Sequence, residues 1–236
     1  MSWGNTMNAF LDTNVIIGYI YSLDPLHTAS QKAIVAENTN YYSFHVHEEI
    51  KFVSQRKDRE YVKFLTKLED IFKKYGDNDF IDLSDIHIRV DGFGDIGKLD
   101  VENMHSAVNI IWEELHFDEN TDAFRVKTKF NKYVGNFESK HRSLRKYCLK
   151  KMNFIPAYQN KDPNVLKVIA NKSLRDYFHG EDEDILFDVH EYLKTNAIKD
   201  LVLISNDNEF VKAISELINV LSFNKFLYLE DLLKNS

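Results

Sequence analysis

Short apolar runs alternate with helical periodicity at both ends of this 236-residue chain, and this alternation constrains the fold more than any other feature. The apolar runs are too short for helices and end in polar residues, which is typical of buried strands. We expect strands at about 8–11, 41–44, 201–205 and 226–229. We expect helices at about 15–23, 45–72, 182–196 and 208–218. Strands that alternate with helices predict an α/β fold with a central, mostly parallel sheet.

The middle of the chain, residues 57–160, has mainly helical periodicity, and no linker rich in Ser, Gly or Pro separates it from the two ends. We therefore expect a single domain over 1–236 whose core comprises about 1–56 and 161–236. The middle then forms a large, mainly helical insertion. Apolar and polar residues alternate in part of it, which adds a possible short hairpin near 79–97.

Composition excludes several classes of protein. Hydrophobic residues make up 44% of the chain and charged residues 28%, which excludes a disordered protein. The formal net charge of −7 excludes a uniformly basic nucleic-acid coat protein but not a nuclease. Cys148 is the single cysteine, so a disulfide-stabilised secreted scaffold is excluded. The amino end shows no basic leader, and the longest apolar stretch, 15–23, is shorter than the roughly 20 residues of a membrane span. We therefore expect a cytoplasmic protein without a membrane segment.

Carboxylates follow the predicted strands. Asp12 ends the first strand, a Glu pair at 48–49 follows the second, and Asp207 follows the strand near the carboxyl end. A run of acids at 182–184 opens a helix. Because α/β sheets bind ligands beyond the carboxyl ends of their strands, these acids are candidates for one shared site. Like charges at short range raise each other's pKa, and a bound divalent cation removes that conflict. Oxygen ligands favour Mg²⁺ or Mn²⁺.

Each acid also has an ordinary structural explanation. Asp207 lies in a segment that resembles a helix capping box, and acids at 182–184 would favour the positive end of a helix dipole. Glutamates at 48–49 on a surface helix are most often solvated. Asp12 is the hardest to explain in this way, because the chain around it is apolar and a buried carboxylate needs a partner.

Five segments occur in an order that is typical of one protein family. They are Phe10-Leu-Asp-Thr-Asn-Val-Ile-Ile17, Glu49-Ile50 after Ser43, Asp184-Ile-Leu, Leu203-Ile-Ser-Asn-Asp-Asn-Glu-Phe210 and Phe226-Leu-Tyr-Leu-Glu-Asp-Leu-Leu233. Together they resemble the motifs of the PIN-domain nucleases, metal-dependent ribonucleases that include the toxins of toxin–antitoxin pairs. The resemblance covers about 1–55 and 175–236, and it implies a three-layer PIN-like fold. The middle of the chain is longer than in the small toxins.

The resemblance implies a Mg²⁺- or Mn²⁺-dependent endoribonuclease. In that family, metal-activated water hydrolyses the phosphodiester bond and leaves 5′-phosphate and 3′-hydroxyl ends. The implied metal ligands and catalytic residues are Asp12, Glu49, Asp184 and Asp207, with Glu48, Asp182 and Asp188 as competing candidates. Asn14 and Ser205 would orient the carboxylates or a bound water. The implied partner is RNA, and a homodimer, an antitoxin or another protein partner is compatible with the family.

A basic segment supplies a candidate RNA-binding surface. Residues 125–151 hold ten Lys and Arg but a single acid, Glu138, and four aromatic residues are interleaved with them. Cations attract phosphate, and aromatic rings stack on bases. The predicted RNA contacts are Lys127, Lys129, Lys132, Arg142, Arg145 and Lys146. An ordinary amphipathic helix explains the aromatic residues but not the shortage of acids. An acidic partner protein would leave the same pattern.

Other interpretations stay open. The chain could be a catalytically silent PIN-like module that binds RNA or protein. A phosphatase of the haloacid-dehalogenase type is a further alternative, which Asn14 disfavours because that family has a second Asp there. The segment 92–97 matches the dinucleotide-binding spacing G-x-G-x-x-G, but no second strand follows it, so the sequence favours a turn.

Overall fold

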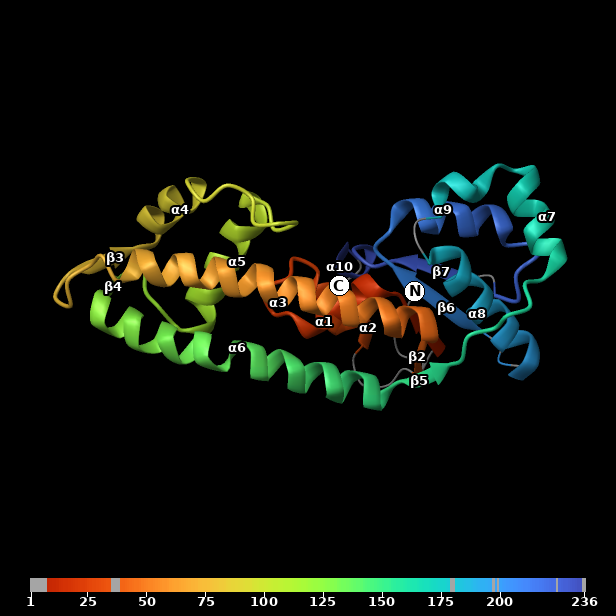
Figure 1. Ribbon diagram of the computed structural model, residues 1–236, viewed down its shortest axis with the longest axis horizontal. Helices are drawn as coiled ribbons and strands as arrows, with labels where there is room; N and C mark the ends of the chain where they lie inside the picture. The colour runs from red at the N-terminus through yellow and green to blue at the C-terminus, as the bar shows by residue number, and fades with distance from the viewer. Residues whose placement is uncertain are drawn as a thin grey trace. The chain divides into compact units, whose positions relative to one another are not determined.

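The computed structural model describes residues 8–34, 39–178, 181–196, 198, 200–223 and 225–234 (Figure 1). The chain forms two compact units. The sheet unit comprises Met1–Ile20, Leu26–Phe52 and Lys146–Ser236, and the helical unit comprises Tyr21–Pro25 and Val53–Arg145. The first residues of the chain, where we expect no leader, lie outside the described ranges.

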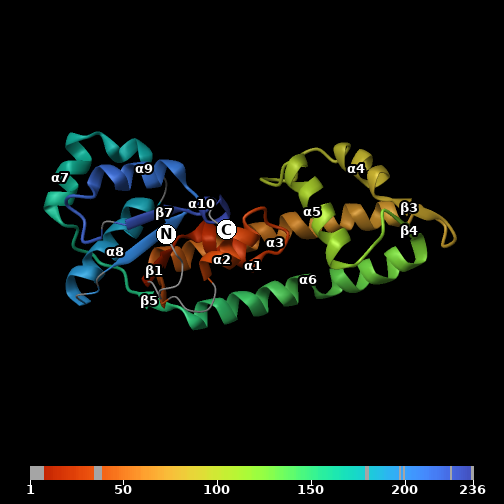
Figure 2. The same ribbon diagram turned by 180° about the vertical axis from the view of Figure 1, so that it is seen from behind.

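The sheet unit is built on five parallel strands in the order β5-β2-β1-β6-β7 (Figures 1 and 2). They are β1 (Asn8–Leu11), β2 (Thr39–Ser43), β5 (Asn153–Ile155), β6 (Leu201–Ser205) and β7 (Lys225–Tyr228). The predicted α/β class with a parallel central sheet is confirmed. In the central strand β1, Ala9, Phe10 and Leu11 are fully buried, as expected where a parallel strand is covered on both faces.

Helices flank this sheet. They are α1 (Thr13–Ile20), α2 (His27–Ile34), α7 (Pro163–Asn171), α8 (Asp182–Asn196), α9 (Asn208–Leu217) and α10 (Asp231–Lys234), with a 3₁₀ turn, η1 (Leu174–Tyr177). The connection through α1 and α2 leads from β1 to β2, and the connection through α9 leads the other way, from β6 to β7. Since crossovers between parallel strands are right-handed, these two connections cover opposite faces. The sheet is therefore the middle of three layers.

The order of the strands creates a natural binding position. β1 and β6 are neighbours, yet their following connections run toward opposite edges of the sheet. Ligands of open α/β sheets bind at such a switch point, beyond the carboxyl ends of the two strands. The backbone N–H of Asp12 donates to the carbonyl of Ile204 at 3.1 Å, so the two strand ends lie level.

Two long helices, α3 (Phe44–Phe72) and α6 (Ala123–Lys151), have residues in both units. The rest of the helical unit comprises α4 (Leu83–Asp91), α5 (Val101–Glu114) and a two-stranded antiparallel sheet of β3 (Phe80–Asp82) and β4 (Asn120–Asp122). Aromatic side chains of its two long helices pack together, as with Phe72 and Phe130, whose ring centroids are 4.8 Å apart. No helix in the described ranges is both long and apolar enough to cross a membrane.

The predicted hairpin near 79–97 is wrong. β3 pairs with the distant β4, and the residues after β3 form α4. Ile86 and Val90 are four residues apart and buried, whereas Ile88 between them is exposed, so the apolar period here is helical. The Gly-rich segment 92–97 therefore follows a helix rather than a strand, which removes the context that dinucleotide binding needs.

The predicted boundary of the insertion also differs from the structure. The sequence predicts residues 146–160 within the insertion, but they belong to the sheet unit. The reason is β5, which the sequence did not predict and which pairs with β2 at the edge of the sheet.

Candidate active site

Asp12 lies at the switch point, between the end of β1 and the start of α1, and is only 5% exposed. Its Oδ1 accepts a hydrogen bond from the backbone N–H of Thr13 at 2.7 Å. Its Oδ2 accepts from Asn14 Nδ2 at 2.8 Å and from Ser205 Oγ at 2.6 Å. The carboxylate is thus held by residues that follow or end the two central strands. Asn14 and Ser205 therefore both hold the same oxygen of the Asp12 carboxylate.

Burial raises the pKa of Asp12 to about 7, against a usual value of 3.8. The hydrogen bonds from Ser205 and Thr13 lower this pKa, and the nearby carboxylates of Glu49 and Asp182 raise it further. Glu49 of α3 and Asp182 of α8 therefore both act on Asp12, which lies between β1 and α1. A divalent cation beside Asp12 would favour the ionised form and relieve this repulsion.

Glu49 reaches the site from the early part of α3 through Thr13. The Oγ1 of Thr13 donates to Glu49 Oε2 at 2.6 Å. Thr13 thus connects Glu49 to the loop that carries Asp12, a role that the motifs did not predict. Its place directly after Asp12 was the available signal. Glu48, the competing candidate, instead pairs with Lys51 on the same helix, and none of its described contacts involves the Asp12 site.

The two candidate acids at the start of α8 differ in their surroundings. Asp182 is close enough to raise the pKa of Asp12. Asp184 pairs with Lys161, whose Nζ lies 2.7 Å from its Oδ1 and 2.9 Å from Glu183 Oε1. Of these two acids, Asp182 acts electrostatically on Asp12, whereas Asp184 forms an ion pair with Lys161.

Asp188 is a structural acid within the sheet unit. It is fully buried, and its carboxylate accepts from the backbone N–H of Tyr158 at 2.9 Å and pairs with His45 Nδ1 at 2.8 Å. Burial raises its pKa, while the contacts to Tyr158 and His45 lower it. These partners join α8 to the start of α3 and to the segment after β5.

Asp207 acts as the N-cap of α9. Its Oδ1 accepts from the backbone N–H groups of Glu209 and Phe210 at 2.8 and 2.9 Å. Asp207 therefore has a structural role as the cap of this helix. Asp207 is still linked to the site, because its own N–H donates to Ser205 Oγ at 3.0 Å and that hydroxyl donates to Asp12.

The donors around Asp12 suit a hard divalent cation. The carboxylates of Asp12, Glu49 and Asp182 offer only oxygen, which Mg²⁺ and Mn²⁺ prefer. Their ligand atoms do not all lie within 4.8 Å of one another. Mg²⁺ usually retains several waters and takes only one or two carboxylates directly, so it does not need all three acids as direct ligands. The residues present therefore fit the ion that the family resemblance implies.

A second cluster, Asp162, His190 and Glu191, does bring its ligand atoms within 4.8 Å of one another. Lys194 already supplies a cation there, with its Nζ 2.8 Å from Asp162 Oδ2 and 3.3 Å from Glu191 Oε1. This ammonium lowers the pKa of Asp162. His190 Nδ1 accepts from the backbone N–H of Ser222 at 2.9 Å, so the neutral ring carries its proton on Nε2 and cannot ligate a metal through that atom.

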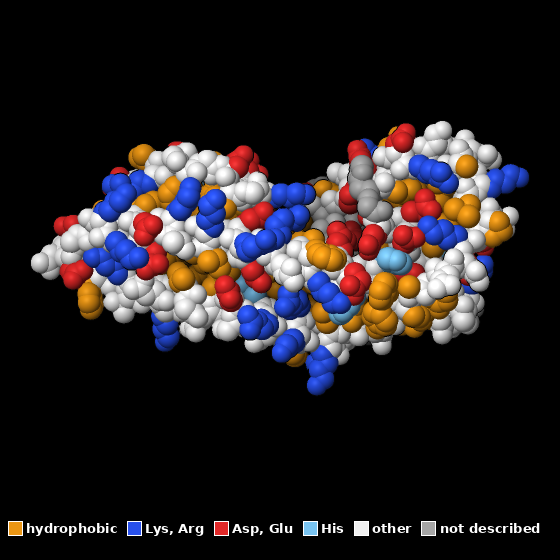
Figure 3. Space-filling model, viewed as in Figure 1, with side chains coloured by type: hydrophobic (Ala, Val, Ile, Leu, Met, Phe, Trp, Pro, Cys, Tyr) orange, Lys and Arg blue, Asp and Glu red, His pale blue; other side chains and the backbone are white. Residues whose placement is uncertain are grey.

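The predicted RNA contacts on α6 fall into two groups. Lys127 and Lys129 donate to backbone carbonyls, Lys127 to Tyr75 and Lys129 to Leu115, both at 2.6 Å. They therefore fasten α6 to neighbouring segments of the helical unit. Basic side chains also protrude along the course of α6 (Figure 3). The remaining predicted contacts are half-buried or exposed: Lys132, Arg142, Arg145 and Lys146.

The aromatic residues interleaved with these cations mostly belong to the core. Phe130 and Phe137 are buried, and Tyr133 is half-buried, whereas Tyr147 is 57% exposed. An amphipathic helix thus explains most of the aromatic pattern.

Compared with family models, curated proteins and solved structures, the chain shows no match. The PIN-domain resemblance therefore stays a prediction that rests on the motifs and on the geometry of the site.

Proposed function

We propose that the chain is a PIN-like, Mg²⁺- or Mn²⁺-dependent endoribonuclease that acts through the Asp12 site. The observation that carries this proposal is the buried carboxylate of Asp12 at the switch point, with its pKa raised to about 7 and two further acids beside it. Such a perturbed acid in a binding position is typical of functional sites.

The cation, when bound, would supply a Lewis acid and lower the pKa of a coordinated water. Asp12, Glu49 and Asp182 would hold it. Ser205 and Asn14 fix the Asp12 carboxylate, and Thr13 fixes Glu49, so that the site is preorganised before RNA arrives. We expect products with 5′-phosphate and 3′-hydroxyl ends.

The test is cleavage of a structured RNA pool under single-turnover conditions, with Mn²⁺ and with EDTA. Because a metal site contributes several kcal/mol to the transition state, Asp12→Asn should slow cleavage by about a thousandfold or more. Cleavage at the wild-type rate by this variant, or in EDTA, would disprove the metal-site mechanism.

Two matched pairs of variants locate the other ligands. Glu49→Gln should slow cleavage far more than Glu48→Gln, because only Glu49 contacts Thr13 of the site loop. Asp182→Asn should slow it far more than Asp184→Asn, because Asp184 pairs with Lys161. Equal effects within either pair would contradict the assignment.

A second candidate function is a catalytically silent module that binds RNA or protein. It is favoured by the engagement of two implied ligands elsewhere, Asp184 with Lys161 and Asp207 as the cap of α9. Binding of RNA without cleavage by the wild type in Mn²⁺ would support this module. A haloacid-dehalogenase-type phosphatase is favoured less, because the amide of Asn14 donates to Asp12 and cannot act as a general acid.

A further inference from the structure

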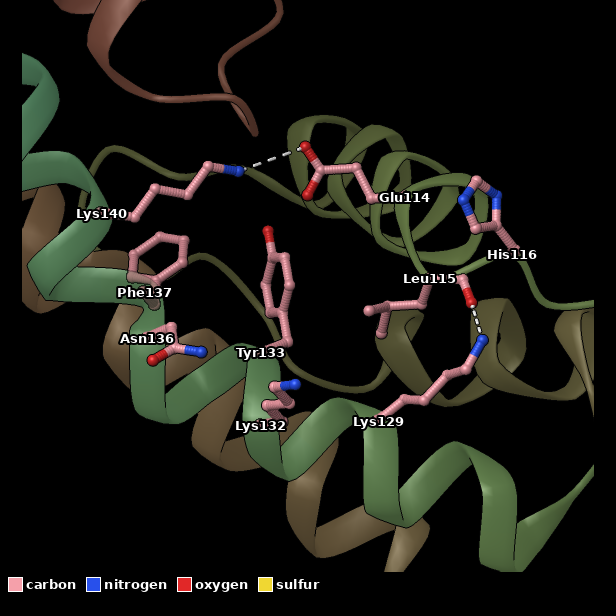
Figure 4. Close-up of a pocket in the computed structure, with 9 residues that line it drawn as sticks. All are labelled: Glu114, Leu115, His116, Lys129, Lys132, Tyr133, Asn136, Phe137 and Lys140. Carbon is pink, nitrogen blue, oxygen red and sulfur yellow. Dashed lines mark hydrogen bonds and ion pairs between the residues drawn. The ribbon is translucent and has the colours of Figure 1, made fainter.

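The helical unit contains a cavity of about 370 Å³ between the carboxyl end of α5 and the middle of α6 (Figure 4). This volume lies near the lower end of the roughly 300–1,000 Å³ found for small-ligand sites. It suits one small ligand rather than a folded peptide.

The charge of the lining is positive. Lys129, Lys132 and Lys140 contribute three cations, and Glu114 contributes one carboxylate. Lys140 lies 3.6 Å from Glu114, and Lys129 donates to the carbonyl of Leu115. Lys132 is exposed and has no hydrogen-bond or ion-pair partner within the described ranges. The cavity can therefore attract an anion, and Lys132 is the side chain that can receive it.

Apolar and aromatic side chains line the interior of the cavity. Figure 4 shows the ring of Tyr133 standing between the side chains of Phe137 and Leu115. Burial raises the pKa of Tyr133, and Glu114 raises it further, so the phenol keeps its proton. An aromatic ring of this kind can stack on a nucleobase.

We infer that this cavity binds one nucleotide, with the base against Tyr133 and the phosphate at Lys132. The base of a nucleotide matches the aromatic side of the cavity and its phosphate matches the lysines, whereas an acidic peptide would match only the lysines. The nucleotide could be free or part of a single-stranded RNA, since both present a base and a phosphate. In the RNA case the cavity extends the proposed ribonuclease function and rests on it.

The test is calorimetric titration of the full chain, in EDTA, with adenosine 5′-monophosphate, with ribose 5-phosphate and with a five-nucleotide single-stranded RNA. Without metal the RNA is not cut, so binding is measured separately from activity. The nucleotide should bind about tenfold or more tightly than ribose 5-phosphate, because only the nucleotide stacks on Tyr133.

A charge reversal tests the phosphate position. Lys132→Glu should weaken nucleotide binding by about tenfold or more. The matched control is Lys63→Glu, an exposed lysine on α3 of the same unit that does not line the cavity and should change affinity less than about twofold. Far-UV circular dichroism of both variants verifies that they fold.

The outcomes separate the possibilities. Binding of the RNA but not of the free nucleotide would assign the cavity to an RNA strand, and the reverse would assign it to a free nucleotide. Equal binding of ribose 5-phosphate, equal effects of the two variants, or tighter binding of pentaglutamate would overturn the proposal. If the wild type binds the nucleotide but does not cleave RNA in Mn²⁺, that result would count against the proposed function alone.

Discussion

At the level of single residues, the pKa of Asp12 links the candidate site to the stability of the fold. The usual pKa of this carboxyl is 3.8 and its pKa in the folded chain is about 7. Between these values the folded chain binds more protons than the unfolded chain, so protonation favours folding. The resulting stabilisation is complete below pH 3.8 and is lost as the pH rises through about 7.

We expect Asp12→Asn to remove this part of the pH dependence. Relative to the variant, the free energy of unfolding of the wild type should fall by up to about 4 kcal/mol as the pH rises from 4 to 8. Urea denaturation at several pH values measures both curves. Parallel curves would show that the pKa of Asp12 is not raised in the folded protein.

Divalent cations should restore the stability that the wild type loses at high pH. At pH 8, Mn²⁺ at about a hundred times its dissociation constant should stabilise the wild type by about 2.7 kcal/mol, because it binds only the folded chain. Asp12→Asn should show little of this effect, and Asp188→Asn should retain it, since Asp188 contacts His45 and Tyr158 instead. Thermal melting with and without Mn²⁺ measures the shift, and an equal shift in wild type and Asp12→Asn would place the metal elsewhere.

The sequence predicted those site residues whose positions are determined by the end of a strand. Asp12 and Ser205 end or follow adjacent strands, so their contact follows from the parallel sheet. The choice between Asp182 and Asp184 depends instead on the orientation of one helical turn. With 3.6 residues per turn, two residues so spaced point about 200° apart, and tertiary packing decides which one faces the site.

At the level of elements, two lysines of α6 fasten this helix to neighbouring segments of the helical unit. Lys127 Nζ donates to the carbonyl of Tyr75 and lies 2.8 Å from Asp77 Oδ1. Lys129 Nζ donates to the carbonyl of Leu115, just past the end of α5. Cations are favourable at the carboxyl ends of helices, where carbonyls lack helical partners.

We expect Lys127→Ala and Lys129→Ala each to lower stability by about 1 kcal/mol. Neither should change the salt dependence of RNA binding, because their ammonium groups are already engaged. Urea denaturation and binding titrations at several salt concentrations measure the two effects. An unchanged stability together with a flatter salt dependence would show that these lysines contact RNA instead.

Element prediction succeeded where caps and periodicity agree and failed where they do not. Asp207 caps α9, and this helix begins at Asn208, where the sequence predicts it. β5 has three residues, of which Asn153 and Phe154 are exposed, so it carries no apolar run to recognise. Its strand conformation comes from pairing with β2, a partner far away in sequence.

At the level of the whole molecule, charge is distributed unevenly. The chain carries a formal net charge of −7, although residues 125–151 hold ten cations and one acid. In the space-filling view, acidic side chains gather on the sheet unit (Figure 3). An acidic site needs basic residues to attract RNA, and the affinity they supply falls with salt.

We expect simultaneous replacement of Lys132, Arg142 and Lys146 by Ala to weaken RNA binding. Loss of three phosphate contacts should also reduce the slope of log affinity against log salt by about 2 for a single strand. Filter binding of a labelled RNA with inactive Asp12→Asn as the parent measures the slope without cleavage. The same change at Lys63, Lys73 and Lys74 is the control, and an equal flattening there would show that the attraction is general.

The register of the central strands has a consequence for synthesis. Asn8 of β1 pairs with Leu201 of β6, so the middle of the sheet joins segments from nearly opposite ends of the chain. At about 5–20 residues per second, a ribosome needs roughly ten to forty seconds to make the intervening chain. During that time β1, whose last three residues are fully buried in the finished sheet, lacks one of its two neighbours. We therefore expect a chaperone to bind the nascent chain until β6 has emerged.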